Sequence, residues 1–331
     1  MFKCRICENL IDNTTYETKE MMFGLKDKFE YFQCAQCYCL QIASIPSDMS
    51  KYYPSNYYSY SHKEPYIKKS NNSIIAFIRK LRDHYTITNY GAFGRILYLM
   101  FPNEYLKSVI DSHFPLRNRR DLLDKTKKIL DVGCGTGNFL WILKELGFDN
   151  LFGIDPYIEG NIIFPNGLKI LKKTIHDLNE EFDLIMFHHS FEHVSDPLET
   201  LQSASRLLKK GGICLVRVPI VDSYAWKHYK ENWYALESPR HFFLHSIKSI
   251  KILADKTGFI LKDIIYDSTA FNLWASEQYV RNIPLESELS YAKNKDKSIF
   301  TDRDIRAFKK LSIALNKEKR GDQAAFYLKR I

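Results

Sequence analysis

Residues 129–138 read Ile-Leu-Asp-Val-Gly-Cys-Gly-Thr-Gly-Asn, a short apolar run that meets three glycines at alternate positions. The apolar run predicts a buried strand, and the amphipathic segment after it predicts a helix. Glycine lets the backbone turn sharply between the two and lets a ligand approach it closely. We therefore expect a ligand-binding turn at Gly133, Gly135 and Gly137.

Four further apolar runs follow, and helical signals fall between them. The expected strands are LFGID (151–155), GLKILKK (167–173), FDLIMF (182–187) and ICLVRVP (213–219). Asp196, Pro197 and Glu199 form a helix start with an N-cap residue and a proline at the first helical position. Alternating strands and helices predict a doubly wound α/β fold with a mostly parallel, Rossmann-like sheet.

Two acidic residues indicate which ligand the glycine turn binds. A dinucleotide fingerprint reads GxGxxG, whereas this chain has GxGxG with Asp131 two positions ahead. A carboxylate there would repel a pyrophosphate and would suit an ammonium or a sulfonium. Asp155 ends the second expected strand, where a carboxylate can accept hydrogen bonds from ribose hydroxyls.

Four segments, ILDVGCGTGNFL, GIDP, FDLIMFHHSFEHV and RLLKKGGICLVRVP, resemble in order and spacing the class I S-adenosylmethionine-dependent methyltransferases. The resemblance covers about residues 127–270. It implies S-adenosyl-L-methionine as the cofactor, with Asp131 and the three glycines at its methionine part and Asp155 at its ribose. It also implies that the chain near Ile175–Asp177, after the third expected strand, borders the adenine.

Two Cys-x-x-Cys pairs predict a metal site near the N-terminus. Cys4 and Cys7 precede Cys34 and Cys37 with 26 intervening residues. Two such pairs supply the four thiolates of a closed, structural Zn²⁺ site, and Cys39 is a substitute ligand with the wrong spacing. We expect a zinc ribbon over residues 1–50, a tyrosine-rich and helical substrate-side region over 51–126, and a methyltransferase domain over 127–331.

Tyrosines crowd the segment KYYPSNYYSYSHKEPY (51–66). They either pack where the ribbon meets the next domain or line a substrate pocket, because a phenol buries area and also forms hydrogen bonds. In the second interpretation Tyr58 and Tyr60 contact the substrate. Ribbon, tyrosines and methyltransferase motifs together resemble zinc-ribbon methyltransferases of bacterial glycan and deoxysugar pathways. This resemblance implies a small sugar-type acceptor and a role in polysaccharide biosynthesis.

The segment FHHSFEHVSDP (187–197) follows the fourth expected strand, at the sheet edge where α/β proteins bind ligands. His189 and His193 are four residues apart, as two metal ligands on one helix face would be. Adjacent His188 and His189 point to opposite sides of an extended chain, and methyl transfer from a sulfonium needs no Lewis acid. We expect His188 to contact the cofactor or the core and His193 to contact the substrate, and the metal interpretation stays open.

A second histidine cluster lies in NWYALESPRHFFLHS (232–246). The resemblance implies that this segment closes over the substrate and that His241 acts as the general base. Members that methylate sugar carbon commonly carry Glu-His, whereas this chain carries Arg240-His241 with its nearest acid at Glu237. Oxygen methylation therefore stays open beside carbon methylation. A histidine base contributes roughly 10²–10⁴-fold in rate.

The net charge of +9 suits phosphate-bearing partners, among them nucleic acid, nucleotide sugars and an anionic membrane face. The chain also resembles ribosomal RNA guanine methyltransferases that combine a four-cysteine ribbon with this catalytic domain. This resemblance implies ribosomal RNA as the alternative acceptor, bound with the ribbon and with basic residues such as Arg119 and Lys127. A binding module with a degenerate catalytic domain is disfavoured by the intact glycine turn. No apolar run is long enough to span a bilayer, and we expect a cytoplasmic protein. The sequence leaves the oligomeric state open.

Overall fold

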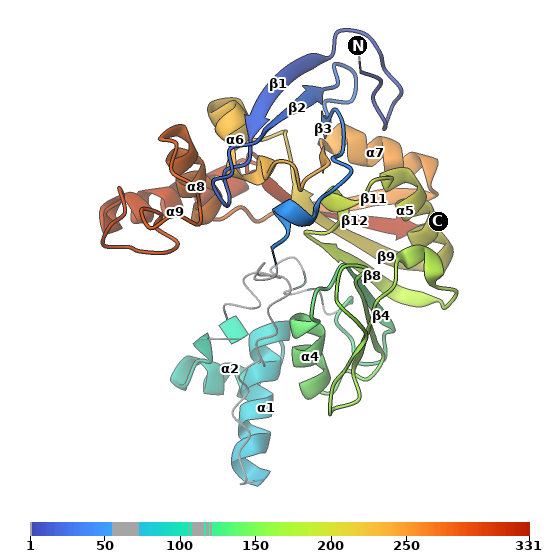
Figure 1. Cartoon of the computed structure of the whole chain (residues 1–331). Helices are drawn as coiled ribbons and strands as arrows, with labels where there is room; N and C mark the ends of the chain where they lie inside the picture. Colours follow the sequence, from blue (N-terminus) through green and yellow to red (C-terminus); the bar gives the residue numbers. More distant parts are fainter. Residues whose placement is uncertain (1, 55–72, 105, 108–115, 117–118, 120) are drawn as a thin grey trace. The chain divides into compact units, whose positions relative to one another are not determined.

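The computed structural model describes residues 2–54, 73–104, 106–107, 116, 119 and 121–331 (Figure 1). The chain divides into two compact units. Unit 1 comprises residues 1–54, 189–202 and 216–328, and unit 2 comprises residues 55–188, 203–215 and 329–331. The expected domain boundaries at residues 50 and 126 are a different partition and stay a prediction.

Unit 2 contains the glycine turn and the strands around it. These strands are β4 (Ile129–Val132), β5 (Leu151–Ile154), β6 (Ile162–Ile163), β7 (Lys169–Leu171) and β8 (Phe182–His188). Strand β4 pairs in parallel with β5 and with β8, and β5 pairs in parallel with β7. Every residue of β4 is buried, as expected for a strand between two neighbours.

The eight-stranded sheet has the order β11-β12-β9-β8-β4-β5-β7-β6. Its other strands are β9 (Leu208–Pro219), β11 (Phe259–Tyr266) and β12 (Gln323–Arg330). Only the short β6 is antiparallel to its neighbour β7 among the pairings given above. All five expected strands are present, so the predicted Rossmann-like, mostly parallel fold is confirmed.

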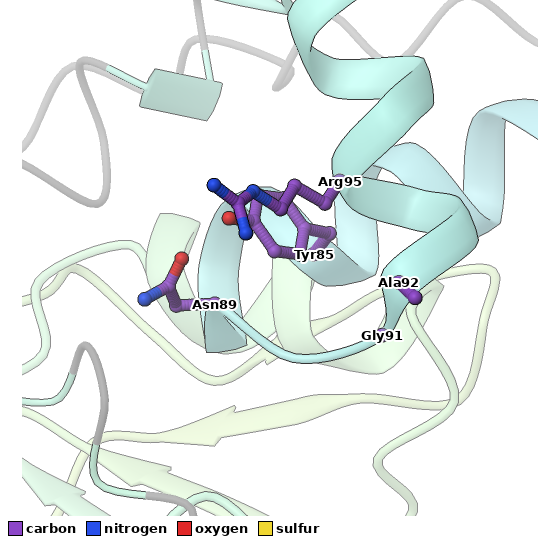
Figure 2. Close-up of a pocket in the computed structure, with 5 residues that line it drawn as sticks. All are labelled: Tyr85, Asn89, Gly91, Ala92 and Arg95. Carbon is purple, nitrogen blue, oxygen red and sulfur yellow. The ribbon is translucent and has the colours of Figure 1, made fainter.

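A helical hairpin precedes this sheet in the chain. Helix α1 (Ser73–Thr88) and helix α2 (Ala92–Met100) are joined by a turn that contains Asn89 and Gly91 (Figure 2). Gly94 lies inside α2, where a β-carbon would come within 2.5 Å of the Leu81 carbonyl oxygen and 2.8 Å of the Tyr85 β-carbon. A glycine at this position therefore allows the two helices to approach closely.

Unit 1 begins with an antiparallel sheet of order β1-β2-β3-β10. Its strands are β1 (Thr14–Lys19), β2 (Lys28–Gln33), β3 (Leu40–Ile42) and β10 (Phe243–Leu244). Strand β10 directly follows His241 and Phe242 in the sequence. The ribbon and the loop that contains His241 therefore share one sheet.

Most of the remaining helices start at a residue whose side chain caps them. The remaining helices are α4 (Asn138–Glu145), α5 (Pro197–Leu207), α6 (Tyr224–Tyr229), α7 (Ile247–Lys256), α8 (Ala270–Val280) and α9 (Asp302–Lys317). Asp196 Oδ1 accepts a hydrogen bond from the Glu199 amide at 2.9 Å, which confirms the expected N-cap of α5. Across the described residues, no helix combines the length and apolar character that a bilayer crossing requires.

Candidate active site and metal centre

The glycine turn between β4 and α4 has the conformation that its sequence predicts. Gly133, Gly135 and Gly137 have φ values of 72°, 55° and 79°, in the left-handed region that side chains rarely adopt. A β-carbon on Gly137 would also lie only 2.4 Å from Ile170 Cδ1. Both the backbone and the packing therefore require glycine at position 137.

Asp155, at the end of β5, holds this turn in place. Its Oδ2 accepts a hydrogen bond from the Gly135 amide at 2.9 Å, and its Oδ1 accepts one from the Tyr157 amide at 2.8 Å. The carboxylate is therefore fixed at the carboxyl edge of the sheet. A carboxylate oxygen can accept more than one hydrogen bond, so a carboxylate at this position suits a ligand hydroxyl.

Asp131 lies in β4 and is 4% exposed. Its Oδ1 is buried and makes no hydrogen bond with any described residue. Burial, together with the nearby charge of Asp155, raises the pKa of Asp131 to about 8. A buried acid of this kind needs a cationic or donor partner, and a ligand ammonium would supply one.

The other expected cofactor residues differ in their surroundings. The ring of His188, at the end of β8, packs edge-on against Phe139 of α4 at a centroid distance of 6.2 Å. Asp177 is exposed and caps the turn η3 (Ile175–Asp177), because its Oδ2 accepts two hydrogen bonds from Thr174 at 2.8 Å. Its contact with adenine stays a prediction. The structure adds Asn138, whose buried Oδ1 makes no hydrogen bond with the part of the chain described.

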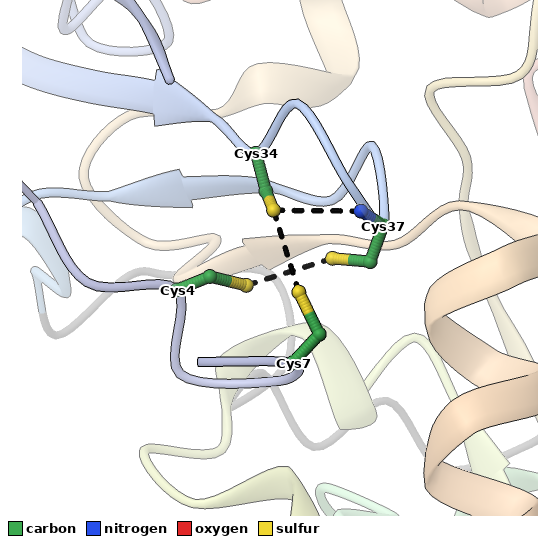
Figure 3. Close-up of side chains that lie close together, drawn as sticks. All are labelled: Cys4, Cys7, Cys34 and Cys37. Atoms are coloured by element: carbon green, nitrogen blue, oxygen red, sulfur yellow. Dashed lines mark hydrogen bonds between the residues drawn. The ribbon is translucent and has the colours of Figure 1, made fainter. Parts of the chain in front are cut away.

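The four expected metal-binding cysteines converge at one point (Figure 3). The Sγ atoms of Cys4 and Cys37 are 3.5 Å apart, as are those of Cys7 and Cys34, and all four lie within 4.8 Å of one another. These separations exceed the ~2.05 Å of a disulfide and approach the edge of a tetrahedron with ~2.3 Å zinc–sulfur bonds. The Sγ of Cys39 instead faces the Leu244 carbonyl oxygen at 3.4 Å.

A second group in unit 1, the carboxylate–histidine cluster, contains Glu192, His193, Glu237 and His241. Glu192 and His193 lie on the turn η4 (Phe191–His193). Glu192, His193 and His241 each offer one potential ligand atom, and these three atoms lie within 4.8 Å of one another. His189 is outside this trio and donates instead to Glu192 Oε1 at 3.2 Å. The structure therefore groups His193 with His241, and not with His189, the partner that the open metal interpretation considers.

Backbone carbonyls orient both imidazoles of the cluster. His193 Nδ1 lies 2.9 Å from the Arg240 carbonyl oxygen, and His241 Nδ1 lies 2.7 Å from the Ala235 carbonyl oxygen. Because a carbonyl only accepts, each Nδ1 carries the proton. His241 Nε2 then faces Glu237 Oε2 at 3.4 Å and Glu192 Oε1 at 4.0 Å. Both nitrogens of His241 thus face oxygen atoms that can accept hydrogen bonds.

The cluster sets the charge state of its members. Burial raises the pKa of Glu192, but the hydrogen bond from His189 and the neighbouring histidines outweigh it and lower this pKa to about 2. Burial and the adjacent His241 lower the pKa of His193. His193 is also the more exposed of the two cluster histidines. It is therefore a neutral imidazole whose Nε2 can accept a proton near neutral pH.

Sequence reasoning missed part of this cluster. Glu192 was not expected as a site residue, although it directly precedes His193 in the sequence. Its Oε2 is buried without a hydrogen-bond partner among the described residues. Tyr53, whose hydroxyl lies 3.4 Å from His193 Nδ1, comes from the expected tyrosine-rich segment. Tyr58 and Tyr60 lie outside the described residues.

The basic side chains of unit 2 gather at a different place from the one that the sequence suggests for RNA binding. Arg119 forms an ion pair with Asp121 at 2.8 Å, so its charge is largely compensated. Lys80 and Lys125 instead converge on Gly147, where both Nζ atoms lie within 3.6 Å of the position of a β-carbon. Lys144 lies beside them and pairs with Asp149. These three lysines form a local cationic group that the sequence did not reveal.

Residues 104–262 match the family model of a methyltransferase domain. The chain is 30% identical over 176 residues to a tRNA U34 carboxymethyltransferase from Helicobacter acinonychis, covering 48% of this chain and 67% of that enzyme. Enzymes of the same name from six further species are 24–28% identical, and the chain spans 34–62% of their length.

A ubiquinone biosynthesis O-methyltransferase from a Ruegeria species is 31% identical over 121 residues, covering 33% of this chain and 48% of that enzyme. Among solved structures, an S-adenosylmethionine-dependent methyltransferase from Archaeoglobus fulgidus is similar with a TM-score of 0.40. It is 19% identical, and the match covers 71% of this chain and 98% of that one.

Proposed function

We propose that this chain, which belongs to the class I S-adenosylmethionine-dependent methyltransferases, methylates a nucleoside of transfer RNA. One observation carries the choice of acceptor: seven similar curated enzymes share the name tRNA U34 carboxymethyltransferase. The comparisons lend no support to the sugar pathway that the sequence suggests. They favour the RNA alternative, here with transfer RNA in place of ribosomal RNA.

The residues of unit 2 fit the cofactor. The orphaned Oδ1 of Asp131 suits the ammonium of its methionine part, and the fixed carboxylate of Asp155 suits the ribose hydroxyls. The glycine turn offers backbone that a ligand can approach closely. When bound, S-adenosylmethionine supplies a methyl group on a sulfonium, which is already activated for transfer.

His193 is the proposed catalytic base. Its Nδ1–H is anchored on the Arg240 carbonyl oxygen, which leaves Nε2 to accept the proton of the acceptor group. The lowered pKa of His193 keeps this imidazole neutral and ready at physiological pH. His241 is a positioning residue, because it lies between the carboxylates of Glu192 and Glu237 and is itself buried. This assignment moves the role of general base from His241, where the resemblance implies it, to His193.

The same trio of donor atoms would also suit a divalent cation, since two imidazoles and one carboxylate are a common ligand set. We favour the base, because methyl transfer from a sulfonium needs no Lewis acid. A chelator that removes only weakly bound metal should therefore leave methylation unchanged.

The cationic group of Lys80, Lys125 and Lys144 supports RNA as the partner. Three ammonium groups against the single carboxylate of Asp149 leave a net positive surface. Such a surface binds the phosphate backbone without reading sequence.

A small sugar-type acceptor is the second candidate. It is favoured by Tyr53 beside His193, because an aromatic wall with a hydroxyl suits a compact polar substrate. The two candidates differ in their expected dependence on salt.

The test measures transfer of labelled methyl groups from S-adenosylmethionine to total transfer RNA and to a panel of nucleotide sugars. We expect label in transfer RNA, with a rate that falls as salt rises, since RNA binding releases counterions. Lys125→Ala should raise the KM for RNA and reduce the salt slope by about one. Exposed Lys262→Ala on β11 is the matched control. Label in a nucleotide sugar alone, insensitive to salt, would decide for the second candidate.

His193→Gln should lower turnover roughly 10²-fold or more while the Kd for the cofactor stays unchanged. Because the pKa of His193 is lowered, the acid limb of the pH–rate profile should fall below the ordinary histidine value of 6.5. A profile that is identical in wild type and His193→Gln would exclude His193 as the base.

We further propose that Zn²⁺ occupies the four-cysteine group. The thiol separations support this assignment, and so does Gln41 Nε2, which donates to Cys4 Sγ at 3.0 Å. Hydrogen bonds to ligand sulfurs are typical around bound metal. A closed set of four thiolates leaves no position for substrate, so the role of this zinc is structural.

A further inference from the structure

The outer face of α2 exposes large apolar side chains to solvent. Phe93, Ile96, Leu99 and Met100 are 53–69% exposed. The helix uses its other side, at Gly94, to pack on α1. A surface helix normally turns polar residues outward, so this face indicates an apolar partner.

The charges of the hairpin restrict what that partner is. Between residues 73 and 101 the chain has four basic side chains, Arg79, Lys80, Arg82 and Arg95, and one acidic side chain, Asp83. Asp83 is 4% exposed and pairs with Arg82 at 2.8 Å. The described surface of the hairpin therefore combines apolar side chains with positive charge and has no exposed acid.

A shallow pocket of about 440 Å³ lies beside this face. It is lined by Tyr85, Asn89, Gly91, Ala92 and Arg95. Figure 2 shows Asn89 and Gly91 at the turn between the helices, with the polar ends of Asn89 and Arg95 to one side of it. A guanidinium, an amide and a phenol together can bind an anionic oxygen group.

We propose that the α1–α2 hairpin docks on the surface of an anionic lipid bilayer, with Arg95 at a lipid phosphate. Apolar side chains that enter the headgroup boundary beside lysine and arginine are the features of an interfacial helix. Tyr85 and Tyr98, whose rings lie 5.7 Å apart, suit the level of the headgroups. This inference does not depend on the identity of the methyl acceptor.

Other partners fit this surface less well. In a symmetric contact with a second copy, Arg95 would face the same positive surface, and like charges in an interface are costly. RNA would pair with the cations but would leave exposed Ile96, Leu99 and Met100 without a contact, since RNA-binding surfaces use aromatic stacking and charge. An anionic bilayer complements both properties at once.

The test is flotation of the full chain with vesicles of phosphatidylcholine, with and without phosphatidylglycerol. We expect binding that needs the anionic lipid. The double variant Phe93→Ser/Met100→Ser should weaken it about tenfold, and Arg95→Ala about fivefold. Ile313→Ser, at another exposed apolar position on α9, is the control and should bind as wild type does.

Cofactor affinity and thermal unfolding of each variant establish that it is folded. Equal vesicle binding by wild type and the double variant would overturn the proposal. A wild-type dimer that dissociates in the double variant would also overturn the proposal. So would a wild type that binds polyuridine but no vesicles, if the double variant loses the polyuridine binding.

Discussion

The buried acid Asp131 makes cofactor binding and protein stability oppose each other. Unfolded aspartate loses its proton near pH 3.8, whereas folded Asp131 keeps it up to about pH 8, because burial and the charge of Asp155 disfavour ionisation. The folded state thus binds the extra proton between these values. By linkage, the free energy of unfolding falls as pH rises through this window, by ~1.4 kcal/mol per pH unit.

Between pH 3.8 and pH 7 this slope lowers the free energy of unfolding by about 4 kcal/mol. The Asp131→Asn variant has no proton to lose, so we expect it to raise the stability of the cofactor-free protein by about 2–4 kcal/mol at pH 7. Near pH 4 the two proteins should be almost equal. Each kcal/mol corresponds to roughly 2–4 °C in Tm, which thermal unfolding at the two pH values resolves. Exposed Asp263→Asn should shift neither value.

The same substitution should weaken the cofactor. Loss of a charged acceptor for the ammonium costs roughly 1.5–3 kcal/mol, or about 10–100-fold in Kd. Since an ammonium favours the ionised acid, binding to wild type near pH 7 should release close to one proton. Calorimetry in buffers of different ionisation enthalpy measures this release. Cofactor binding without proton release, or a variant that is less stable at pH 7, would refute the assignment of Asp131.

Two more predictions follow from packing and from the cysteines. Gly137 and Gly167 have similar φ values, 79° and 83°, so an alanine strains the backbone equally at either position. Gly137→Ala should nevertheless lower the free energy of unfolding by about 1–3 kcal/mol more than Gly167→Ala, because of side-chain overlap. Only the first β-carbon meets a neighbour, Ile170; equal Tm losses would contradict this. Elemental analysis should find one zinc per chain, lost in Cys4→Ser and kept in Cys39→Ser. A second stoichiometric metal that is lost in His193→Gln would show that the carboxylate–histidine cluster binds a cation.

The sequence predicts the sheet and the cysteine group well, for identifiable reasons. A buried parallel strand such as β4 is a continuous apolar run, and the Cys-x-x-Cys spacing allows few geometries. The carboxylate–histidine cluster is harder to predict, because its members come from separate segments. Glu237 itself has a left-handed backbone, with φ at 40°, and this conformation allows its side chain to face His241. No local sequence pattern marks that turn. The burial of Glu192 likewise depends on residues distant in sequence.

Arg240 connects the ribbon to the loop that contains His241. It is fully buried and binds Glu20, which follows β1, at 3.2 Å and Glu237 at 3.0 Å. The hydroxyl of Tyr31, in β2, also donates to the His241 carbonyl oxygen at 2.9 Å. In a chimera with a foreign ribbon, Arg240 would be buried without one of its two carboxylates, a loss that costs about 3–5 kcal/mol. The ribbon and the loop that contains His241 must therefore be exchanged together, and natural recombination between related enzymes should preserve them as a pair.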